Sequence, residues 1–289
     1  MPPVFRSQVY AFERTARPGR PVRDPCYTAP VPTDPMLAAA LPWAPACAAA
    51  GMAGLAAGGF HYAALWPASQ LFGRSVIAGK DAAEVALTYD DGPNDPYTGQ
   101  LLDVLARHHI HATFFVIGRY VKEKPHLVRA VHRAGHTIGC HTMTHPRLMY
   151  MRHPHIRSEI ADATALIEDA IGDRIRFFRP PFGARNPAVF RALRELHLTP
   201  VMWNVMSFDW SARSAADIEQ RVQRGIERNQ QRKRGSNILL HDGGHLAMGT
   251  DRRRTVNATA NILAAAAPDL RFVTVDRFCS EARSARSLK

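Results

Sequence analysis

From Glu84 onward, short apolar segments alternate with amphipathic ones, and this alternation restricts the possible folds more than any other feature. Strands are expected at 85–89, 112–117, 137–140, 176–179, 200–205, 237–240 and 271–275. Helices are expected between them, at 98–108, 125–134, 155–171, 187–196, 214–230 and 251–266. Strands that alternate with helices in this way pair in parallel. The sequence therefore predicts an α/β fold with a parallel sheet that is closed, or nearly closed, into a barrel.

The N-terminal part of the chain differs from the rest in composition. Residues 1–35 contain five Arg against three acidic residues and several Pro, which predicts a disordered basic leader. Residues 36–67 are rich in Ala and Gly, and no charged residue occurs from 37 to 67, so a transmembrane or signal-anchor helix is expected near 46–66. The positive leader then favours a cytoplasmic N-terminus, with residues 68–289 forming one domain outside the cytoplasm. A buried Ala-rich helix, a cleaved signal and a misassigned start codon are the alternatives.

The chain is strongly basic, with a formal net charge of +12 at pH 7. Only five of its 37 basic residues are Lys, and the densest basic clusters, 232–234 and 252–254, are three residues long. Aromatic residues do not interleave these clusters, so we interpret them as solvated surface and rank nucleic-acid binding last. The four cysteines form no C-x-x-C pair, which excludes a zinc ribbon.

Two adjacent carboxylates, Asp90 and Asp91, follow the first expected strand and precede Gly92-Pro93. At the carboxyl end of a parallel strand they lie where α/β enzymes place their chemistry, and one can bind a metal while the other acts as a base. An ordinary Asp-Asp-Gly-Pro turn is the plainer alternative.

Two histidines, His141 and His145, follow the third expected strand. Their imidazoles can converge if this segment forms a helical turn. Together with one Asp from another strand they would make an open His, His, Asp site of the kind that catalytic zinc occupies. The cluster of histidines in this part of the chain makes a chance pair the competing explanation.

Three further strand ends carry polar or aromatic residues. Arg179 ends the Phe177-Phe178 strand and can pair with a carboxylate, while the stiff Pro-Pro turn after it can aim the backbone N–H of Phe182 at an oxyanion. His241, at the end of the Ile238–Leu240 strand, suits a general acid if Asp209 orients it. Trp210 and Leu239 would form an apolar wall, or would simply be core residues.

Taken together, these strand ends read Thr-Tyr-Asp-Asp-Gly-Pro, His-Thr-x-x-His, Arg-Pro-Pro-Phe-Gly, Asp-Trp and Leu-Leu-His-Asp. In this order they resemble the polysaccharide deacetylases of carbohydrate esterase family 4, over about residues 84–278. The resemblance implies a distorted (β/α)7 barrel that removes acetyl groups from N-acetylglucosamine-type polymers. It also implies that Asp91, His141 and His145 bind a divalent metal, usually Zn²⁺.

The resemblance assigns the remaining roles by position. Asp90 would be the base that deprotonates water, Arg179 would fix Asp90, and the N–H of Phe182 would hold the oxyanion. His241, tuned by Asp209, would protonate the leaving amine. The acetyl methyl group would lie in an apolar cradle formed by Trp210 and Leu239.

Four residues depart from the pattern or have no assigned role. Phe182 stands where many relatives have Tyr, and Met206 stands where some have an acidic residue. Cys140 precedes His141 where Asn or Ser is common. His245 is an additional histidine that either touches substrate or is merely a loop residue.

Several alternatives stay open from the sequence. The domain is either a membrane-anchored or secreted deacetylase, a non-catalytic carbohydrate-binding relative, or an O-acetyl esterase of the xylan type. Peptidoglycan or another glucosamine polymer is the preferred substrate over chitin oligomers and xylan. Co²⁺, Ni²⁺ and Fe²⁺ compete with Zn²⁺ for a His, His, Asp set, and the oligomeric state is open.

Overall fold

The computed structural model describes residues 44–279, so the predicted leader at 1–35 lies outside the described residues. By its internal contacts the chain divides into Met1–Gly51 and Met52–Lys289. The second unit contains all the strands described below. The predicted domain start at residue 68 stays a prediction.

Helix α2, Ala44–Leu65, forms where a membrane-spanning helix was expected. Within residues 44–279, however, no helix combines the length and the hydropathy needed to cross a membrane. The expected membrane span is therefore not supported, because Ala and Gly, which dominate α2, are only weakly apolar.

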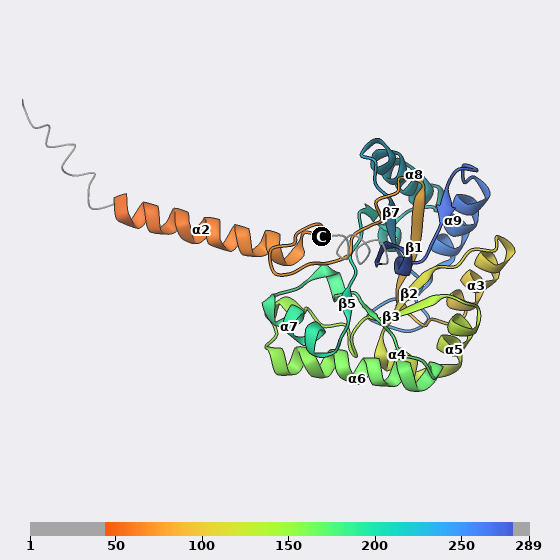
Figure 1. Cartoon of the computed structure of the whole chain (residues 1–289), viewed down its shortest axis with the longest axis horizontal. Helices are drawn as coiled ribbons and strands as arrows, with labels where there is room; N and C mark the ends of the chain where they lie inside the picture. The colour runs from red at the N-terminus through yellow and green to blue at the C-terminus, as the bar shows by residue number, and fades with distance from the viewer. Residues whose placement is uncertain (1–43, 280–289) are drawn as a thin grey trace, which may run out of the picture. The chain divides into compact units, whose positions relative to one another are not determined.

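The described strands form one parallel sheet in the order β5-β4-β3-β2-β1-β7-β6, and β8 pairs with the start of β1 (Figure 1). Their bounds are β1 Glu84–Gly92, β2 Thr113–Val116, β3 Thr137–Cys140, β4 Phe177–Phe178, β5 Thr199–Pro200, β6 Val205–Met206, β7 Ser236–His241 and β8 Arg271–Phe272. Every residue of β1 is buried, as expected for a central strand. The predicted parallel α/β sheet is confirmed.

The predicted strand at 200–205 is wrong in detail, because β5 and β6 form separately at the two edges of the sheet. Residues 201–204 connect these edges, and side chains bind this connection: Arg179 Nε donates to Val201 O at 3.3 Å, and Asn237 Nδ2 donates to Met202 O at 2.8 Å. Backbone bonds hold its two ends, from Val201 N–H to Phe178 O at 2.8 Å and from Asn204 N–H to Asn237 O at 3.1 Å. Among the described residues β5 and β6 do not pair with each other, so side-chain and backbone bonds to the connection take the place of a ladder between the two edges.

The helices that follow the strands are α3 Tyr97–Arg107, α4 Gly118–Glu123, α5 Pro125–Arg133, α6 His153–Ile171, α7 Pro187–Glu195, α8 Ala215–Gln231 and α9 Arg253–Ala264. Only α4 was not predicted, since its six residues show too little periodicity. Two of these helices have well-defined ends: Ser214 and Asp217 form a reciprocal capping box at α8, and Gly172 ends α6 with φ +72°.

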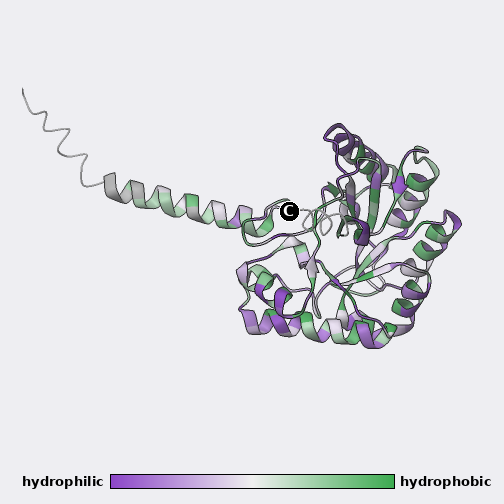
Figure 2. Ribbon diagram, in the orientation of Figure 1, coloured by the Kyte–Doolittle hydropathy of each residue, from purple (hydrophilic) through white to green (hydrophobic). Residues whose placement is uncertain are grey.

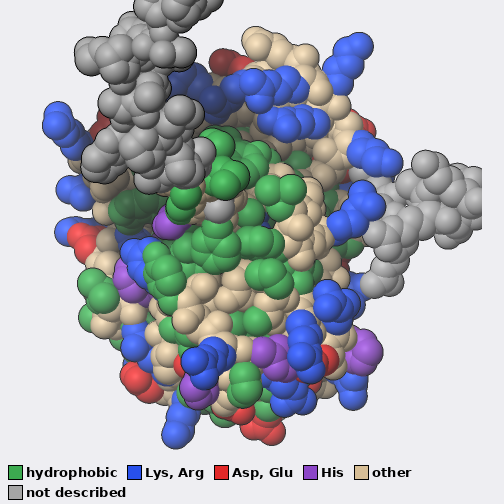
Figure 3. Space-filling model, turned by 90° about the vertical axis from the view of Figure 1, so that its left-hand side faces the viewer, with side chains coloured by type: hydrophobic (Ala, Val, Ile, Leu, Met, Phe, Trp, Pro, Cys, Tyr) green, Lys and Arg blue, Asp and Glu red, His purple; other side chains and the backbone are tan. Residues whose placement is uncertain are grey.

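Hydropathy separates the two sides of these helices. The longer helices, such as α6 along the lower edge of Figure 2, carry both green and purple residues, as expected for helices that cover a sheet. In the view of Figure 3, Lys and Arg side chains are spread over the surface and few Asp or Glu lie among them. The face in this view therefore carries an excess of basic side chains, as the composition predicts.

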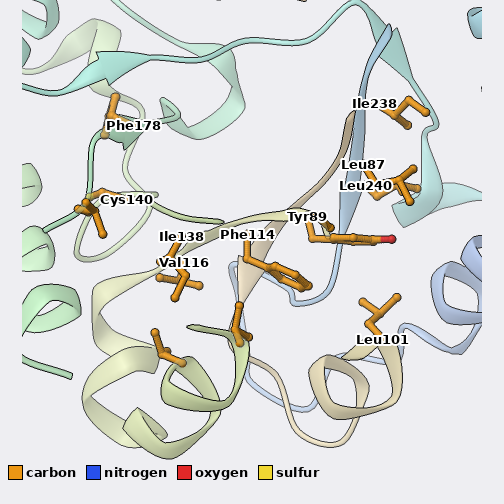
Figure 4. Packing of buried hydrophobic residues seen from close by; sticks show 14 of the residues in the cluster. Leu87, Tyr89, Leu101, Phe114, Val116, Ile138, Cys140, Phe178, Ile238 and Leu240 are labelled. Atoms are coloured by element: carbon orange, nitrogen blue, oxygen red, sulfur yellow. The ribbon is translucent and has the colours of Figure 1, made fainter. Parts of the chain in front are cut away.

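The core lies between the sheet and the surrounding helices (Figure 4). Tyr89 of β1 stacks on Phe114 of β2 with ring centroids 5.0 Å apart, and Leu101 of α3 is fully buried in the same cluster. Tyr89 Oη also hydrogen-bonds to Thr259 of α9 at 2.9 Å, which satisfies its buried hydroxyl. This packing fixes β1, and with it the residues at its carboxyl end.

Two helical glycines test how closely α8 packs. A Cβ added to Gly225 would lie 2.4 Å from Val205 Cγ1, whereas a Cβ on Gly99 of α3 would meet nothing within 4 Å. Gly225→Ala should destabilise the protein by about 1–3 kcal/mol, because the branched Val205 cannot move away. Gly99→Ala, the matched control, should stabilise it by about 0.5–1 kcal/mol through helix propensity. Urea unfolding measures both, and equal effects would contradict the close packing of α8.

Candidate active site

A β-bulge at Asp91 brings the two adjacent carboxylates together. Asp90 pairs with Phe115 and Gly92 pairs with Val116, so Asp91 is the extra residue, with φ +72°. In a regular strand neighbouring side chains point to opposite faces, but the bulge redirects the second one. As a result both carboxylates approach the Nε2 atom of His141, at 3.8 Å for Asp90 Oδ2 and 3.5 Å for Asp91 Oδ1.

The loop after β7 packs directly on this bulge. A Cβ on Gly243 would lie 1.9 Å from the carbonyl oxygen of Asp91, and a Cβ on Gly92 would lie 2.2 Å from Asp242 Oδ2. Only glycine therefore fits at 243 without moving backbone atoms. Asp242 is itself buried, and burial raises its pKa to about 7 although Thr98 Oγ1 donates to it at 2.6 Å.

His141 and His145 converge, but the helical turn on which the sequence argument depended does not form. The segment is an irregular loop in which Thr142 and His145 have φ +66° and +62°. Thr142 Oγ1 accepts from the N–H of His145 at 3.0 Å and fixes the loop. The two rings end with centroids 4.9 Å apart.

The nitrogen and oxygen atoms of these residues fit a divalent cation. The Nδ1 atom of His141 lies 2.7 Å from the carbonyl oxygen of Arg179, which holds its proton there and leaves Nε2 with a free lone pair. His145 Nε2 lies 3.2 Å from Asp91 Oδ1, and that buried oxygen has no hydrogen-bonding partner among the described residues. Burial lowers the pKa of His141 to about 4 and that of His145 to about 3, so both imidazoles are neutral and able to bind a metal.

Asp91 has the charge that such a site needs. Burial opposes its ionisation, but the surrounding imidazoles, His245 first, hold the pKa of Asp91 below its ordinary value. An ionised carboxylate next to two neutral imidazoles is a donor set typical of catalytic zinc.

Asp90 lies beside this set and is held by Arg179. Arg179 is fully buried, and its Nη1 atom donates to Asp90 Oδ1 at 2.8 Å and to Thr88 Oγ1 at 2.7 Å. Burial raises the pKa of Asp90 above its ordinary value, although the Arg179 charge lowers it. The predicted pairing with Arg179 thus orients Asp90, and burial makes its carboxylate a stronger base than a solvated one.

His241 and Asp209 form a second charged pair. His241 Nδ1 lies 2.7 Å from Asp209 Oδ1, and the backbone N–H of His241 donates to Asp209 Oδ2 at 2.8 Å. Thr255 Oγ1 donates to the same Oδ2 at 2.9 Å. Burial lowers the pKa of His241, but the Asp209 carboxylate outweighs this and raises it to about 9. His241 is therefore an imidazolium near neutral pH, as a general acid requires.

One cavity of about 380 Å³ is lined both by the cluster of Asp90, Asp91, His141 and His145 and by His241. It is lined by Asp90, Asp91, His141, His145, Pro180, Phe182, Gly183, Trp203, Met206, Trp210, Leu239, His241, His245 and Arg252. Trp210 is half-exposed and its ring meets that of His241 edge-on at 5.2 Å, whereas Leu239 is buried next to Trp203. Phe182, with φ +57°, exposes its ring at the cavity. Of the predicted site residues, Arg179 and Asp209 lie behind the lining and contact it.

Three lining residues were missed or misinterpreted from the sequence. Arg252 belongs to a basic cluster that we interpreted as solvated, but it is buried and its Nε donates to Gly243 O at 2.7 Å. Trp203 lies in an apolar run, and nothing in the sequence indicated that it lines the cavity. His245, which had no assigned role, reaches the cavity beside His145, with ring centroids 4.6 Å apart.

Comparison with known proteins agrees with this geometry. The family model described as polysaccharide deacetylase matches residues 78–201. A peptidoglycan-N-acetylglucosamine deacetylase of Bacillus cereus is 37% identical over 198 residues, which are 66% of this chain and 85% of the relative. The chain belongs to the polysaccharide deacetylase family. A chitooligosaccharide deacetylase of Sinorhizobium fredii is 38% identical over 57% of this chain and 75% of the relative.

The fold agrees with a solved structure of this family. The crystal structure of the Bc1960 peptidoglycan N-acetylglucosamine deacetylase matches with a TM-score of 0.61 at 31% identity, over 70% of this chain and 91% of that one. The parallel sheet and its helices thus form the distorted (β/α)7 barrel that the resemblance implies.

The His241–Asp209 pair gives a measurable pKa. Asp209→Asn should lower the pKa of His241 from about 9 towards or below its ordinary value of 6.5, because the opposing carboxylate is lost while burial stays. Since the folded-state pKa lies above the unfolded one, the pair stabilises the wild type fully below pH 6.5 and loses this contribution as the pH rises through about 9. NMR titration of His241, with unfolding measured at pH 6 and 10, tests both statements. An unchanged pKa in Asp209→Asn would contradict the assigned cause.

Proposed function

We propose that this protein is a metal-dependent hydrolase that removes N-acetyl groups from an N-acetylglucosamine-containing polysaccharide and releases acetate. The observation that carries the proposal is the shared cavity, which has a basic carboxylate beside a metal-binding set and a protonated imidazole within the same space. Amide hydrolysis needs an activated water, a polarised carbonyl and an acid for the amine, and the cavity offers a group for each.

Asp91, His141 and His145 would hold a divalent cation, with Zn²⁺ our first choice. When bound there, it supplies polarisation of the acetyl carbonyl and of the attacking water. The Asp90 carboxylate accepts the proton of that water, and Arg179 keeps Asp90 Oδ1 in place at 2.8 Å so that Oδ2 faces the cavity. The backbone N–H of Phe182 donates to the oxyanion that forms on the acetyl carbon.

His241 completes the reaction. Its imidazolium donates a proton to the glucosamine nitrogen as the C–N bond breaks, so that a neutral amine leaves. Asp209 keeps Nδ1 occupied at 2.7 Å and leaves Nε2 to face the substrate. Trp210 and Leu239 enclose the acetyl methyl, which limits the site to a small acyl group.

A second pocket, rich in Arg side chains, favours an anionic polymer as the substrate. It has a volume of about 480 Å³, shares Met206 with the cavity, and is lined by Phe208, Arg221, Arg224, Glu227, Arg228 and Gln231. Three Arg face one Glu there, and Arg221 Nη1 donates to Ser207 O at 3.2 Å. Peptidoglycan carries carboxylates and chitin does not, so we propose a peptidoglycan-type polymer and hence action outside the cytoplasm.

Asp90→Asn tests the proposed base. It should reduce acetate release from acetylated glycans by roughly 100- to 10,000-fold, because proton transfer is lost while the side-chain shape is kept. Bound metal, measured by elemental analysis, should stay at the wild-type ratio. Asp103→Asn, on the exposed side of α3, is the matched control and should keep full activity.

Two outcomes would redirect the proposal. Undiminished release by Asp90→Asn would remove Asp90 from the mechanism. Binding of glycan by the wild type without any acetate release would favour a non-catalytic carbohydrate-binding protein. Acetylated xylan in the same panel separates an O-acetyl esterase from an N-deacetylase.

The Arg-rich pocket makes a separate prediction about substrate choice. Arg224→Gln/Arg228→Gln should raise the KM for peptidoglycan roughly 3- to 10-fold at low salt, with less effect at high salt and none on chitin oligomers. The control Arg107→Gln/Arg133→Gln removes the same charge from exposed positions of α3 and α5. Equal losses on both substrates, or from both double variants, would contradict an anion-binding role for the Arg-rich pocket.

A further inference from the structure

We propose that His245 is a metal-binding residue of this site, in addition to the two histidines of the His141–His145 loop. It lies in the loop after β7, whereas His141 and His145 lie in the loop after β3. One donor atom from each of Asp91, His145 and His245 lies within 4.8 Å of the others. The inference rests on the metal site of the proposed function but not on hydrolysis.

The distances favour a shared cation over direct contacts. His245 Nδ1 lies 3.8 Å from Asp91 Oδ2, which is too long for a hydrogen bond. Two ligands that each lie ~2.0–2.2 Å from one zinc are roughly 3.4 Å apart across a tetrahedral angle. Asp91 Oδ1 lies 3.2 Å from His145 Nε2 and 3.5 Å from His141 Nε2, and the second oxygen, Oδ2, lies 3.8 Å from His245 Nδ1. Each distance is close to that value, with Asp91 turning one oxygen to the His141–His145 loop and the other to His245.

Ring packing holds the His245 imidazole at the site. It stacks on His145 with centroids 4.6 Å apart and an interplanar angle of 23°. The ring of Phe182 meets it edge-on at 5.2 Å, and the guanidinium of Arg147 lies over the Phe182 ring, 4.2 Å from its centroid. The side chain remains 36% exposed, so it can approach or leave a cation without disturbing the core.

The loop itself is fixed by side chains from three other segments. Arg119 donates to the carbonyl of His245, and Tyr120 Oη donates to Gly244 O at 2.9 Å. Arg252 Nε donates to Gly243 O at 2.7 Å. Asn94 Nδ2 donates to the carbonyl of Asp242 at 2.9 Å. These four anchors, two of them from the short helix α4, hold the backbone of the loop beside Asp91 and thereby keep the His245 side chain at the cavity.

A third imidazole has a specific chemical consequence. Catalytic zinc sites keep one position open for water or substrate, beside three protein ligands. His245 would fill that position in the resting protein and give it up when substrate enters. The resting site would then bind metal more tightly than a His, His, Asp set alone. In return, His245 would compete with substrate for the fourth position on the metal.

The test is a metal titration of the full chain. The Kd for Zn²⁺ should rise more than about 100-fold in His245→Ala, beyond the ~10- to 100-fold typical of residues that only orient a ligand. The visible absorption of the Co²⁺-loaded protein should change in the same variant. His155→Ala, at an exposed position of α6, is the matched control and should change neither. Thermal unfolding of the metal-free proteins verifies that each variant is folded.

The outcomes are distinct. Unchanged affinity in His245→Ala, or a wild type that binds no metal, overturns the proposal. Weaker affinity with an unchanged Co²⁺ spectrum also overturns it, because His245 would then only position His145. Tight binding that depends on His245, in a protein that releases no acetate, supports this inference while refuting the proposed function.

Discussion

The buried ion pair between Arg179 and Asp90 is the interaction on which both the sheet and the site depend. Desolvating two charges is costly, and the pair is favourable only when the remaining donors are satisfied. Arg179 meets that condition through Thr88 Oγ1 at 2.7 Å and the carbonyls of Val201 and Met202 at 3.3 and 3.2 Å. The same guanidinium therefore joins β1, β4 and the connection between the sheet edges. The charge that orients the proposed base is also the one that holds the distorted barrel together.

The bulge at Asp91 is the second constraint on the site, and it is needed because the Arg179 ion pair fixes Asp90. With Asp90 fixed by Arg179, a regular strand would turn the next side chain away from the cavity. The left-handed conformation of Asp91 prevents this at a local cost in backbone energy. Gly243, pressed against the Asp91 carbonyl, leaves the bulged backbone room. The strained backbone of Asp91 thus lets two adjacent carboxylates face the same cavity. Asp90 pairs there with Arg179, and Asp91 lies next to His145.

Much of this was predictable from the sequence, for identifiable reasons. Buried parallel strands are apolar runs that end in turns, so β7, expected at 237–240, was located to within one residue at each end. The strand expected at 85–89 begins one residue earlier and continues through the bulge to Gly92, three residues further than expected. The polar residues at the ends of both strands were placed in one site. Long-range contacts were not readable. The edge connection at 201–204 has the same apolar composition as a strand, and only Arg179 and Asn237 reveal that it is not one. The burial of Arg252 was missed because a charged residue outside a helix or strand has no periodicity, and its burial depends on segments far away in the chain. His245 was noted as an additional histidine, but its place beside His145 depends on how the loop after β7 packs.

The electrostatics of the cavity depend on two groups, Asp90 and His241, whose pKa values are raised for opposite reasons. Asp90 becomes more basic because burial outweighs its Arg179 partner, while His241 becomes a weaker acid because Asp209 outweighs burial. Near neutral pH these shifts leave one group able to accept a proton and the other ready to donate one. A bound cation would reduce the pull of Asp91 on His241 and bring the imidazolium closer to the pKa at which proton transfer is most efficient. The proposed metal-binding set and the proposed acid are therefore coupled through Asp91, although their side chains come from different segments of the chain.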